Sequence, residues 1–488
     1  MYKAENAMIL GKNAIYDLDT HRTLRNNNVM VVGSPGSGKT RSIVIPNLLQ
    51  AEGSYVISDP KGNLCDTYGP YLREKGYDVK RLDFVNPGRS IHYNPLSYIK
   101  NEQDVIKLSY VLGSVTEDGS PKHYDPFWTQ TSRLLFSALI AYVKEALISE
   151  EQNLGTVFEM INMINNYTPS MDEKGMELDY LFKKMGESPC QNDMRKFAVS
   201  QYRKFRVSAE KTLRSIVIST IAGVAGLDTS QMRELMAYDE TDICMIGERK
   251  TAFFIVVSDT DRSMDVLANI FFTQALNELC TYADTKCRNN RLPVDVRFIM
   301  DDFATNCRVD NFPRMIASFR SRGISTMLML QAESQLKASY GEDGQTIIGS
   351  CDSYVYLGGN DLETARAISE KSDYPIQDVL NMPVGESIIL RRGENPTRTK
   401  WVELSEMPEY KAAMALYRRG IEAKRRAAKS RSEDKRMSLA EKVEQMYAEE
   451  RKKERESAME LLSRKRYVVD LEEEGGKKEN SSSGESNS

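Results

Sequence analysis

Short, mostly apolar segments recur along the chain and end at glycine, aspartate or other polar residues. Segments of this length and composition are typical of buried β-strands. The predicted strands are Asn28–Val32, Ser54–Ser58, Asp78–Asp83, Ala252–Val257, Val296–Met300, Ile324–Leu330, Ser353–Leu357 and Ser387–Leu390. Helix-compatible segments lie between most of them. Apolar strands that alternate with helices predict an α/β fold, in which helices cover both faces of a mostly parallel sheet.

The pattern changes between residues 101 and 249, where apolar residues recur at helical spacing. One stripe runs from Phe127 to Tyr142, and others cover Val157–Ile164 and Phe197–Ile221. No strand pattern interrupts them, so we expect an all-α insertion at residues 101–249 that splits one α/β domain into residues 1–100 and 250–409. Because insertions on a rigid scaffold commonly carry recognition, the insertion is predicted to be the substrate-recognition domain.

A charged tail is predicted from about residue 410 to residue 488. Between Arg418 and Arg466, 17 lysines and arginines accompany 10 aspartates and glutamates, a net of +7, while the whole chain carries −4. A basic segment beside an acidic body indicates an interaction segment. Ser438–Glu441 fits a helix-capping box ahead of an apolar stripe from Leu439 to Tyr447, which predicts an exposed helix, and residues 475–488 are predicted to be disordered.

Cysteine usage and hydropathy exclude other classes of protein. The seven cysteines form no CxxC pair and only three histidines accompany them, which favours reduced thiols over zinc ligands. The N-terminal segment lacks the apolar core of a secretion signal. The longest apolar stretch, Leu134–Val143, is far shorter than the roughly 18 residues that suggest a membrane span, so we expect a soluble chain without a transmembrane segment of its own.

The clearest chemical motif lies directly after the first predicted strand. It matches the pattern GxxxxGK[ST] and consists of Gly33, Ser34, Pro35, Gly36, Ser37, Gly38, Lys39 and Thr40. Glycines let the backbone curl so that its N–H groups face phosphate oxygens. Lys39 is expected to reach the β- and γ-phosphates of ATP, and the Thr40 hydroxyl to bind Mg²⁺. A purely structural glycine-rich turn is the alternative, but such a turn would need neither the Lys-Thr pair nor the strand.

Carboxylates at the tip of a neighbouring strand would complete an ATPase site. Strand Val296–Met300 ends in Asp301 and Asp302. Asp301 would hold Mg²⁺ through water, and Asp302 would polarise the attacking water. Many strands end in aspartate, so the pair is informative only beside the phosphate-binding motif. Gln331, which ends strand Ile324–Leu330, would sense the γ-phosphate or position water; an ordinary loop glutamine is the alternative.

Basic residues suggest two further features. Arg320 and Arg322 precede the strand that ends at the glutamine, and each is either an arginine finger offered to a neighbouring subunit or an ordinary surface arginine. A basic stretch between residues 195 and 214 includes Tyr202 and Phe205. This stretch would either contact a nucleic-acid backbone or form a solvated helix face, and composition favours the helix face.

In this order, the motifs resemble those of the TraG/TraD family of type IV secretion system coupling proteins, over about residues 10 to 400. The matching segments are Val29–Pro46, Ser58–Gly62, His92–Leu96, Phe127–Trp128, Ile299–Ala304, Arg320–Leu336 and Leu357–Gly359. The Asp-Pro-Lys-Gly, Asn-Pro-Leu and Gln-x-x-x-Gln-Leu elements are far more specific than the phosphate-binding motif. The resemblance is closest to the branch carried by conjugative elements of Gram-positive bacteria.

The resemblance implies more than the residues alone. A family member would have a RecA-like P-loop NTPase core interrupted by an all-α domain, bind ATP and Mg²⁺, and form a homo-hexamer. It would act at the cytoplasmic side of the cell membrane, passing single-stranded DNA with a bound relaxase, or effector proteins, to type IV secretion channel components. Gln331 falls at the family's sensor glutamine and Arg320 at a proposed trans-acting arginine. The expected catalytic residues are Lys39, Asp302, Gln331 and Arg320.

Two departures from the family pattern bear on function. Members usually carry an N-terminal membrane anchor, whereas this chain begins almost at the motor domain. The strand-end pair is usually Asp-Glu, but here it is Asp301-Asp302, and misplacing a catalytic group by about 1 Å can lower a rate about 10²-fold. Two functions therefore stand: a motor that couples ATP hydrolysis to substrate transfer, and an ATP-gated recruitment platform with little motor activity.

Overall fold

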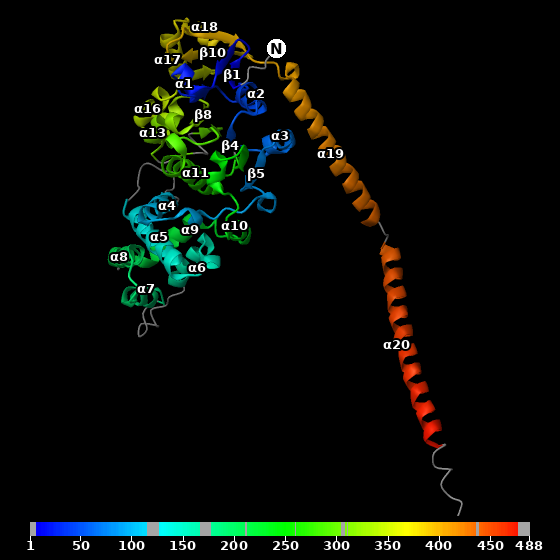
Figure 1. Cartoon of the computed structure of the whole chain (residues 1–488). Coiled ribbons are helices and arrows are strands. Elements are labelled where there is room, and N and C mark those ends of the chain that lie inside the picture. Colours follow the sequence, from blue (N-terminus) through cyan, green and yellow to red (C-terminus); the bar gives the residue numbers. More distant parts are fainter. Residues whose placement is uncertain are drawn as a thin grey trace, which may run out of the picture. The chain divides into compact units, whose positions relative to one another are not determined.

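The computed structural model describes residues 6–114, 126–165, 177–209, 212–258, 260–303, 308–309, 311–435 and 439–476. The chain divides into two compact units, Met1–Tyr417 and Arg418–Ser488. Within the first unit, the helices of residues 101–249 gather on one side of the part that contains the sheet (Figure 1). None of the helices in the described ranges carries an apolar stretch long enough to cross a membrane.

A nine-stranded sheet forms the framework of the first unit, in the order β11-β10-β9-β3-β8-β7-β4-β6-β5. Its strands are β3 Val29–Val32, β4 Ser54–Ser58, β5 Asp78–Asp83, β6 Thr251–Val256, β7 Val296–Met300, β8 Ile324–Leu330, β9 Ser353–Tyr356, β10 Glu386–Arg391 and β11 Thr397–Lys400. The strands from β9 to β5 in this order run parallel, and β10 is antiparallel to both of its neighbours. All the predicted strands are present, which confirms the α/β fold with a mostly parallel sheet.

Three observed strands have no counterpart among the predicted ones. β1 Ala7–Gly11 and β2 Ala14–Asp17 form a separate antiparallel pair. β1 is buried throughout, but so short an apolar run does not distinguish strand from helix by its period. β11 has the sequence Thr-Arg-Thr-Lys and lies at the edge of the sheet, where its only neighbour is β10. An edge strand that is largely exposed needs no apolar side chains, so its sequence carries no strand pattern.

The order of the strands corrects one expectation about the site. The strand that ends in Asp301 was predicted to adjoin the strand of the phosphate-binding motif, and this is wrong. β8 lies between β3 and β7 and pairs with both. Parallel strands are joined by crossovers that pass over the sheet, so the order along the chain does not fix the order in the sheet. Gln331, at the end of β8, consequently lies between the motif and the carboxylates.

Helices fill the segments between strands, and the described part of residues 101–249 contains no strand. The helices of this insertion are α4 Glu102–Ser114, α5 Pro126–Ala146, α6 Leu154–Asn165, α7 Glu177–Glu187, α8 Asp193–Ala209, α9 Leu213–Val224 and α10 Ser230–Leu235. The other helices of the first unit are α1 Thr20–Thr23, α2 Ile45–Leu49, α3 Asn63–Glu74, α11 Asp265–Lys286, α13 Phe312–Met315, α14 Phe319–Arg322, α15 Ser334–Tyr340, α16 Asp343–Gly349, α17 Leu362–Ser372 and α18 Ile376–Leu380. In its described residues the insertion is therefore all-α, as predicted, while its role in substrate recognition stays a prediction.

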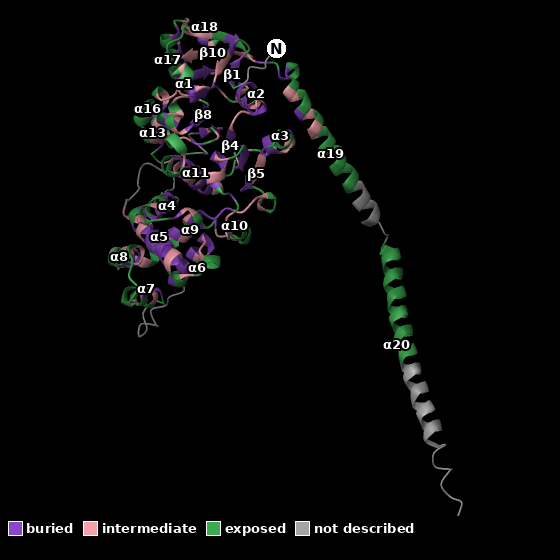
Figure 2. Ribbon diagram, in the orientation of Figure 1, coloured by how far each residue is buried: buried purple, intermediate pink, exposed green. Residues whose placement is uncertain are grey.

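Both faces of the sheet are buried (Figure 2). Because side chains alternate between the faces along a strand, Met30 and Val32 of β3 join one apolar cluster and Val29 and Val31 join another. The first cluster continues through α11 into the helices of the insertion. The second includes the β1–β2 pair, α2 and α3. The insertion and one face of the sheet therefore share a continuous apolar core.

The basic stretch between residues 195 and 214 belongs to α8 and the start of α9. Its aromatic residues, Tyr202 and Phe205, are buried. The ring of Tyr202 stacks on Phe182 of α7, with 4.0 Å between the ring centroids. Arg206 forms an ion pair with Asp179 of α7 at 3.0 Å. Buried rings cannot stack on nucleic-acid bases, so the structure favours the solvated helix face over the nucleic-acid contact.

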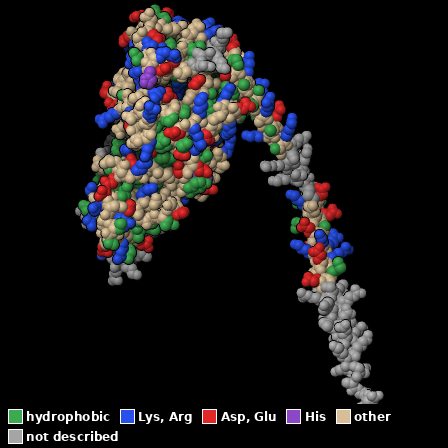
Figure 3. All heavy atoms as spheres, viewed as in Figure 1, with side chains coloured by type: hydrophobic (Ala, Val, Ile, Leu, Met, Phe, Trp, Pro, Cys, Tyr) green, Lys and Arg blue, Asp and Glu red, His purple; other side chains and the backbone are tan. Residues whose placement is uncertain are grey.

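The second unit contains most of α19, Pro408–Lys435, and all of α20, Leu439–Gly476. Every residue of α20 from Leu439 to Glu460 is exposed, which confirms the predicted exposed helix. Acidic and basic side chains are interspersed along this segment (Figure 3). The capping-box residue Ser438 and residues 477–488 of the predicted disordered segment lie outside the described residues. The first two residues of that segment, Gly475 and Gly476, instead end α20, so the prediction of disorder is wrong for them. The start of α19 belongs to the first unit, where Ala413 is buried.

Candidate active site

The phosphate-binding motif forms a tight loop at the carboxyl end of β3. Gly36 and Gly38 have φ angles of +79° and +78°, a left-handed conformation that glycine adopts without steric cost. A π-helical turn, η1 Thr40–Val44, follows directly and leads into α2. Backbone N–H groups at the start of a helical segment carry partial positive charge. The loop therefore has the geometry required of a phosphate cradle.

Backbone hydrogen bonds hold this loop from both sides. The N–H of Gly33 donates to the carbonyl of Leu330, the last residue of β8, at 3.1 Å. The N–H of Ser34 donates to the carbonyl of Gly358, just beyond β9, at 3.0 Å. Since β8 and β9 are the two neighbours of β3, the loop is supported by both adjacent strands.

Lys39 is half-buried and its ammonium group is bound by the loop itself. Its Nζ donates to the carbonyl oxygen of Gly33 at 2.6 Å and to that of Ser34 at 3.4 Å. Burial lowers the pKa of Lys39, and the nearby carboxylates of Asp301 and Asp302 oppose this shift. A phosphate chain in the loop would supply the negative charge that would keep this buried ammonium protonated.

Thr40 and Asp301 are brought together, as the proposed magnesium site requires. The Thr40 hydroxyl donates to Oδ2 of Asp301 at 3.4 Å. Burial raises the pKa of Asp301, and the charge of Lys39 acts in the opposite direction. A hydroxyl beside a carboxylate is the hard oxygen set that Mg²⁺ prefers in nucleotide sites. The residues present therefore fit this ion.

Asp302 has two unusual features. Its φ angle is +54°, a conformation that is uncommon outside glycine and that aspartate tolerates better than most residues. Its Oδ1 atom is shielded from solvent and has no hydrogen-bond partner among the described residues. Buried polar atoms are normally paired, and strained residues gather at functional sites. An unpaired carboxylate oxygen in this position is available to accept a proton or a hydrogen bond from a water molecule.

These residues line a single cleft of about 470 Å³, which is within the range of small-molecule sites. The lining residues are Lys39, Thr40, Asp59, Pro60, Lys61, Asn63, Leu64, Asp301, Asp302 and Gln331. Gln331 is exposed, and its backbone N–H donates a hydrogen bond to the side-chain oxygen of Gln335 at 2.8 Å. The structure thus places five of the predicted residues around one space.

Arg320 does not join them. It lies on α14, before the start of β8, whereas the cleft lies beyond the end of β8. A seven-residue strand spans about 23 Å at about 3.3 Å per residue, so Arg320 is at the opposite edge of the sheet from the cleft of its own chain. Its guanidinium donates to the carbonyl of Thr20 at 2.8 Å. Arg322 is paired with Asp284 at 2.7 Å. A role for Arg320 at a neighbouring subunit's site stays a prediction.

The loop after β4 contributes residues that were not predicted as part of the site. Asp59 is 2% exposed, and its carboxylate accepts the backbone N–H of Cys65 in α3 at 3.0 Å. Burial raises the pKa of Asp59. Lys61 and Asn63 complete this wall of the cleft. The Asp-Pro-Lys-Gly motif directly after a predicted strand was the available signal, because parallel strands end at the same edge of a sheet.

The buried charge of Asp301 gives a stability prediction. The pKa of Asp301 is raised in the folded protein, so the folded state binds this proton more tightly than the unfolded chain does. The ionised carboxylate therefore lowers stability above its folded pKa, and this cost disappears below the unfolded pKa. We expect Asp301→Asn to raise the unfolding temperature of the nucleotide-free protein at neutral pH, with a gain that shrinks toward about pH 4.

Thermal unfolding of both proteins across this pH range is the measurement. Asp193→Asn is the matched control, because the Asp193 side chain is 92% exposed and should change stability by less than about 0.5 kcal/mol. A lower unfolding temperature for Asp301→Asn at neutral pH would show that the lysine contact outweighs the cost of burial.

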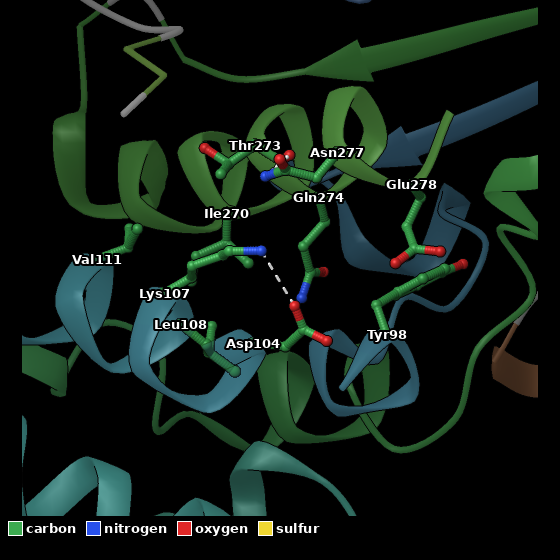
Figure 4. A pocket seen from close by; sticks show the side chains of 10 residues that line it. All are labelled: Tyr98, Asp104, Lys107, Leu108, Val111, Ile270, Thr273, Gln274, Asn277 and Glu278. Carbon is green, nitrogen blue, oxygen red and sulfur yellow. Dashed lines mark hydrogen bonds and ion pairs between the residues drawn. The ribbon is translucent and has the colours of Figure 1, made fainter. Parts of the chain in front are cut away.

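A second hollow, between α4 and α11, does not compete as a substrate site (Figure 4). Its volume is about 30 Å³, which is room for about one water molecule. Asp104 and Lys107 of α4 form an ion pair at its edge, and Ile270 and Gln274 of α11 lie across from them. The hollow and its polar side chains therefore belong to the packing contact between α4 of the insertion and α11.

Residues 3–372 match the family described as "Type IV secretory system Conjugative DNA transfer". The chain belongs to this family. The conjugal transfer protein TraG of Escherichia coli is 23% identical over 369 residues, which cover 71% of this chain and 55% of the relative. The VirD4 protein of Rhizobium radiobacter is 23% identical over 368 residues, with 70% and 47% coverage. The chain thus spans about half the length of these relatives.

The fold of the chain is also similar to that of a solved structure. The plasmid coupling protein TrwB in complex with ADP and Mg²⁺ matches with a TM-score of 0.53 and 17% identity, covering 82% of this chain and 90% of that one. The expected RecA-like P-loop NTPase fold and the resemblance to coupling proteins are therefore confirmed. The narrower expectation, the branch of Gram-positive conjugative elements, stays a prediction.

Proposed function

We propose that this chain is an ATPase that couples hydrolysis to the passage of relaxase-bound single-stranded DNA into a type IV secretion channel. The observation that carries the proposal is the meeting of Lys39, Thr40, Asp301 and Asp302 in one cleft of a chain from the conjugative DNA transfer family. A phosphate-binding loop alone would indicate nucleotide binding. The carboxylates at the end of β7 add what hydrolysis requires.

Binding would begin with an exchange of partners at Lys39. Its ammonium now bonds to the carbonyls of Gly33 and Ser34, and it would turn to the β- and γ-phosphates of ATP. The Thr40 hydroxyl and the Asp301 carboxylate would hold Mg²⁺, directly and through water. The ion, when bound, neutralises charge on the phosphates.

Hydrolysis would then depend on a water molecule placed between Asp302 and Gln331. The free Oδ1 of Asp302 would accept a proton or hydrogen bond from this water. The Gln331 amide, at the end of the strand between the motif and the carboxylates, would orient the same water or contact the γ-phosphate. This division of roles is typical of P-loop NTPases, in which positioning and charge carry most of the catalysis.

We propose the partners and the assembly on the basis of the family and of the position of Arg320. Arg320 is too far from its own cleft to act there, so a catalytic role for it requires a neighbouring subunit, and we propose a homo-hexamer. The insertion would recognise the relaxase–DNA substrate. The segment from Arg418, with its net positive charge, would choose partners among type IV secretion channel components at the cytoplasmic side of the membrane. The TraG and VirD4 names of the relatives support this setting.

An ATP-gated recruitment platform is the second candidate, and Asp302 favours it. A carboxylate shorter than the family's usual glutamate would leave hydrolysis slow, so that nucleotide binding serves assembly rather than movement. Protein effectors, instead of DNA, are the alternative cargo for either candidate.

Steady-state ATPase assays on the full chain distinguish the candidates. A motor is expected to hydrolyse ATP at about 1 s⁻¹ or faster and to be stimulated several-fold by single-stranded DNA. A platform is expected to bind ATP without such stimulation. Stimulation of hydrolysis by a relaxase or an effector protein, but not by DNA, would indicate that the cargo is protein rather than DNA. Absence of ATP binding would overturn both candidates.

A further inference from the structure

Trp401 lies against the phosphate-binding loop on the side away from the carboxylates. It directly follows β11, and its backbone N–H donates to the carbonyl of Gly385 at 2.9 Å. The ring is in close contact with Gly38, because a Cβ atom placed on Gly38 would lie 2.4 Å from Cη2 of Trp401. This glycine therefore serves both the left-handed turn and the approach of the indole.

The order of the strands decides which part of a nucleotide would lie near this ring. Asp301 and Gln331 end β7 and β8, on one side of β3, and Trp401 follows β11, on the other side. The γ-phosphate must face the carboxylates and the glutamine for hydrolysis. Because the loop holds the middle of the phosphate chain, the ribose and the base would leave it on the opposite side. Trp401 is an aromatic residue that contacts the loop on that side.

The indole of Trp401 carries a buried hydrogen-bond donor, Nε1–H. Within the part of the chain that the structure describes, the indole Nε1–H is shielded from solvent and has no hydrogen-bond acceptor. A buried donor without an acceptor lowers stability, so an acceptor brought by a ligand would be favourable. Two residues on, Glu403 pairs with Arg41 of the loop's own helical turn at 3.7 Å, and both side chains are exposed. The segment after β11 is thus tied to the loop at two points.

We propose that Trp401 contacts the nucleobase: its ring forms the wall against which the base and ribose of the bound nucleotide pack. This inference rests on the proposed nucleotide site and adds to it a residue that recognises the nucleoside rather than the phosphates. Aromatic rings gain from stacking on bases of any sequence, because every base has a π face. Trp401 would therefore contribute to affinity and leave the rate of hydrolysis at saturation unchanged.

The test compares Trp401→Leu with Trp401→Phe in the full chain. Leucine keeps an apolar contact with Gly38 but has no aromatic face, and phenylalanine keeps a ring. We expect Trp401→Leu to weaken Mg²⁺–ATP binding by about 5- to 100-fold and to raise KM in proportion, with kcat nearly constant. Trp401→Phe is expected to stay within about threefold of the unchanged protein.

Magnesium tripolyphosphate, which has no base, separates recognition from support of the loop. If Trp401 contacts the base, Trp401→Leu leaves the affinity for tripolyphosphate unchanged. Equal losses for ATP and tripolyphosphate would overturn the inference in favour of a supporting role, and unchanged ATP affinity would also overturn it. A separate comparison uses Lys39→Ala in a chain that keeps Trp401. If this substitution does not weaken ATP binding, the proposed function is wrong, and the inference falls with it.

Fluorescence provides an independent measurement, because the chain has only two tryptophans. Trp128 lies in the insertion, on α5. In a Trp128→Phe protein, Trp401 is the sole indole, and its emission should change when ATP binds. In a Trp401→Phe protein, the remaining emission of Trp128 should not respond to ATP. The opposite assignment of the two responses would contradict the placement of the base.

Discussion

Replacing Lys39 with alanine is expected to abolish conjugative transfer and to lower ATP hydrolysis by at least about 10²-fold. The size follows from the usual effect of removing one charged group that stabilises a transition state. The fold should remain, because among the described residues the side chain bonds only to the carbonyls of Gly33 and Ser34 and belongs to neither apolar cluster. Transfer frequency in a strain without the unsubstituted copy, and turnover of the purified protein, are the measurements.

Lys12→Ala is the matched control for this experiment. Lys12 is exposed and lies next to the β1–β2 pair, away from the residues that line the cleft. The Lys12→Ala substitution also removes one positive charge from the chain, and both transfer and turnover should stay at the level of the unsubstituted protein. Undiminished transfer by Lys39→Ala would rule out the ATPase function altogether.

Replacing Asp302 has the second large expected effect. Asp302→Asn keeps the shape of the side chain but removes the proton acceptor, so kcat should fall by about 10²-fold or more. ATP affinity should be nearly unchanged, because Thr40 and Asp301 remain to hold the ion. The measurement is kcat on purified protein saturated with single-stranded DNA, beside an equilibrium titration with ATP.

Asp302→Glu tests whether the site is arranged for the shorter aspartate or whether the aspartate slows hydrolysis. The Oδ1 atom of Asp302 is already enclosed, and its φ angle of +54° suits aspartate better than glutamate. We therefore expect the longer side chain to slow hydrolysis by about tenfold or more. Faster turnover would mean that the native site is impaired and would strengthen the recruitment platform. If neither substitution alters kcat, the base must be another carboxylate. Asp59 also lines the cleft, but its carboxylate already accepts the N–H of Cys65.

The sequence predicted the strands of the sheet well because most of them are buried on both faces. Such strands consist almost wholly of apolar residues and stop abruptly at glycine or aspartate, as Val29–Val32 and Val296–Met300 do. β11 could not be found in this way, since an exposed edge strand is free to be polar. The order of the strands was also beyond the sequence. The insertion of β8 between β3 and β7 depends on crossovers, which leave no local pattern.

The same contrast holds for the site. The phosphate-binding loop was predictable because its whole chemistry lies in eight consecutive residues, Gly33–Thr40. The carboxylates and Gln331 were found because each follows a recognisable strand. The contact between Gly38 and Trp401 joins segments far apart in the chain, and single-residue patterns do not record such a pair. Arg320 precedes β8 and therefore lies at the opposite edge of the sheet from the cleft, and its role at a neighbouring subunit's site stays a prediction.

The continuous core between the sheet and the insertion has a mechanical consequence. Phe253 of β6 stacks on Phe271 of α11 at 4.9 Å, and α11 faces Leu108 and Val111 of α4 across a hollow that holds little more than one water molecule. A hinge between the two parts would have to pull these apolar surfaces into water, at about 25 cal/mol for each Å² exposed. We therefore expect the insertion to move with the sheet as one lever arm. In the proposed hexamer, movement driven by ATP would then arise where one subunit slides against the next, rather than from bending inside a single chain.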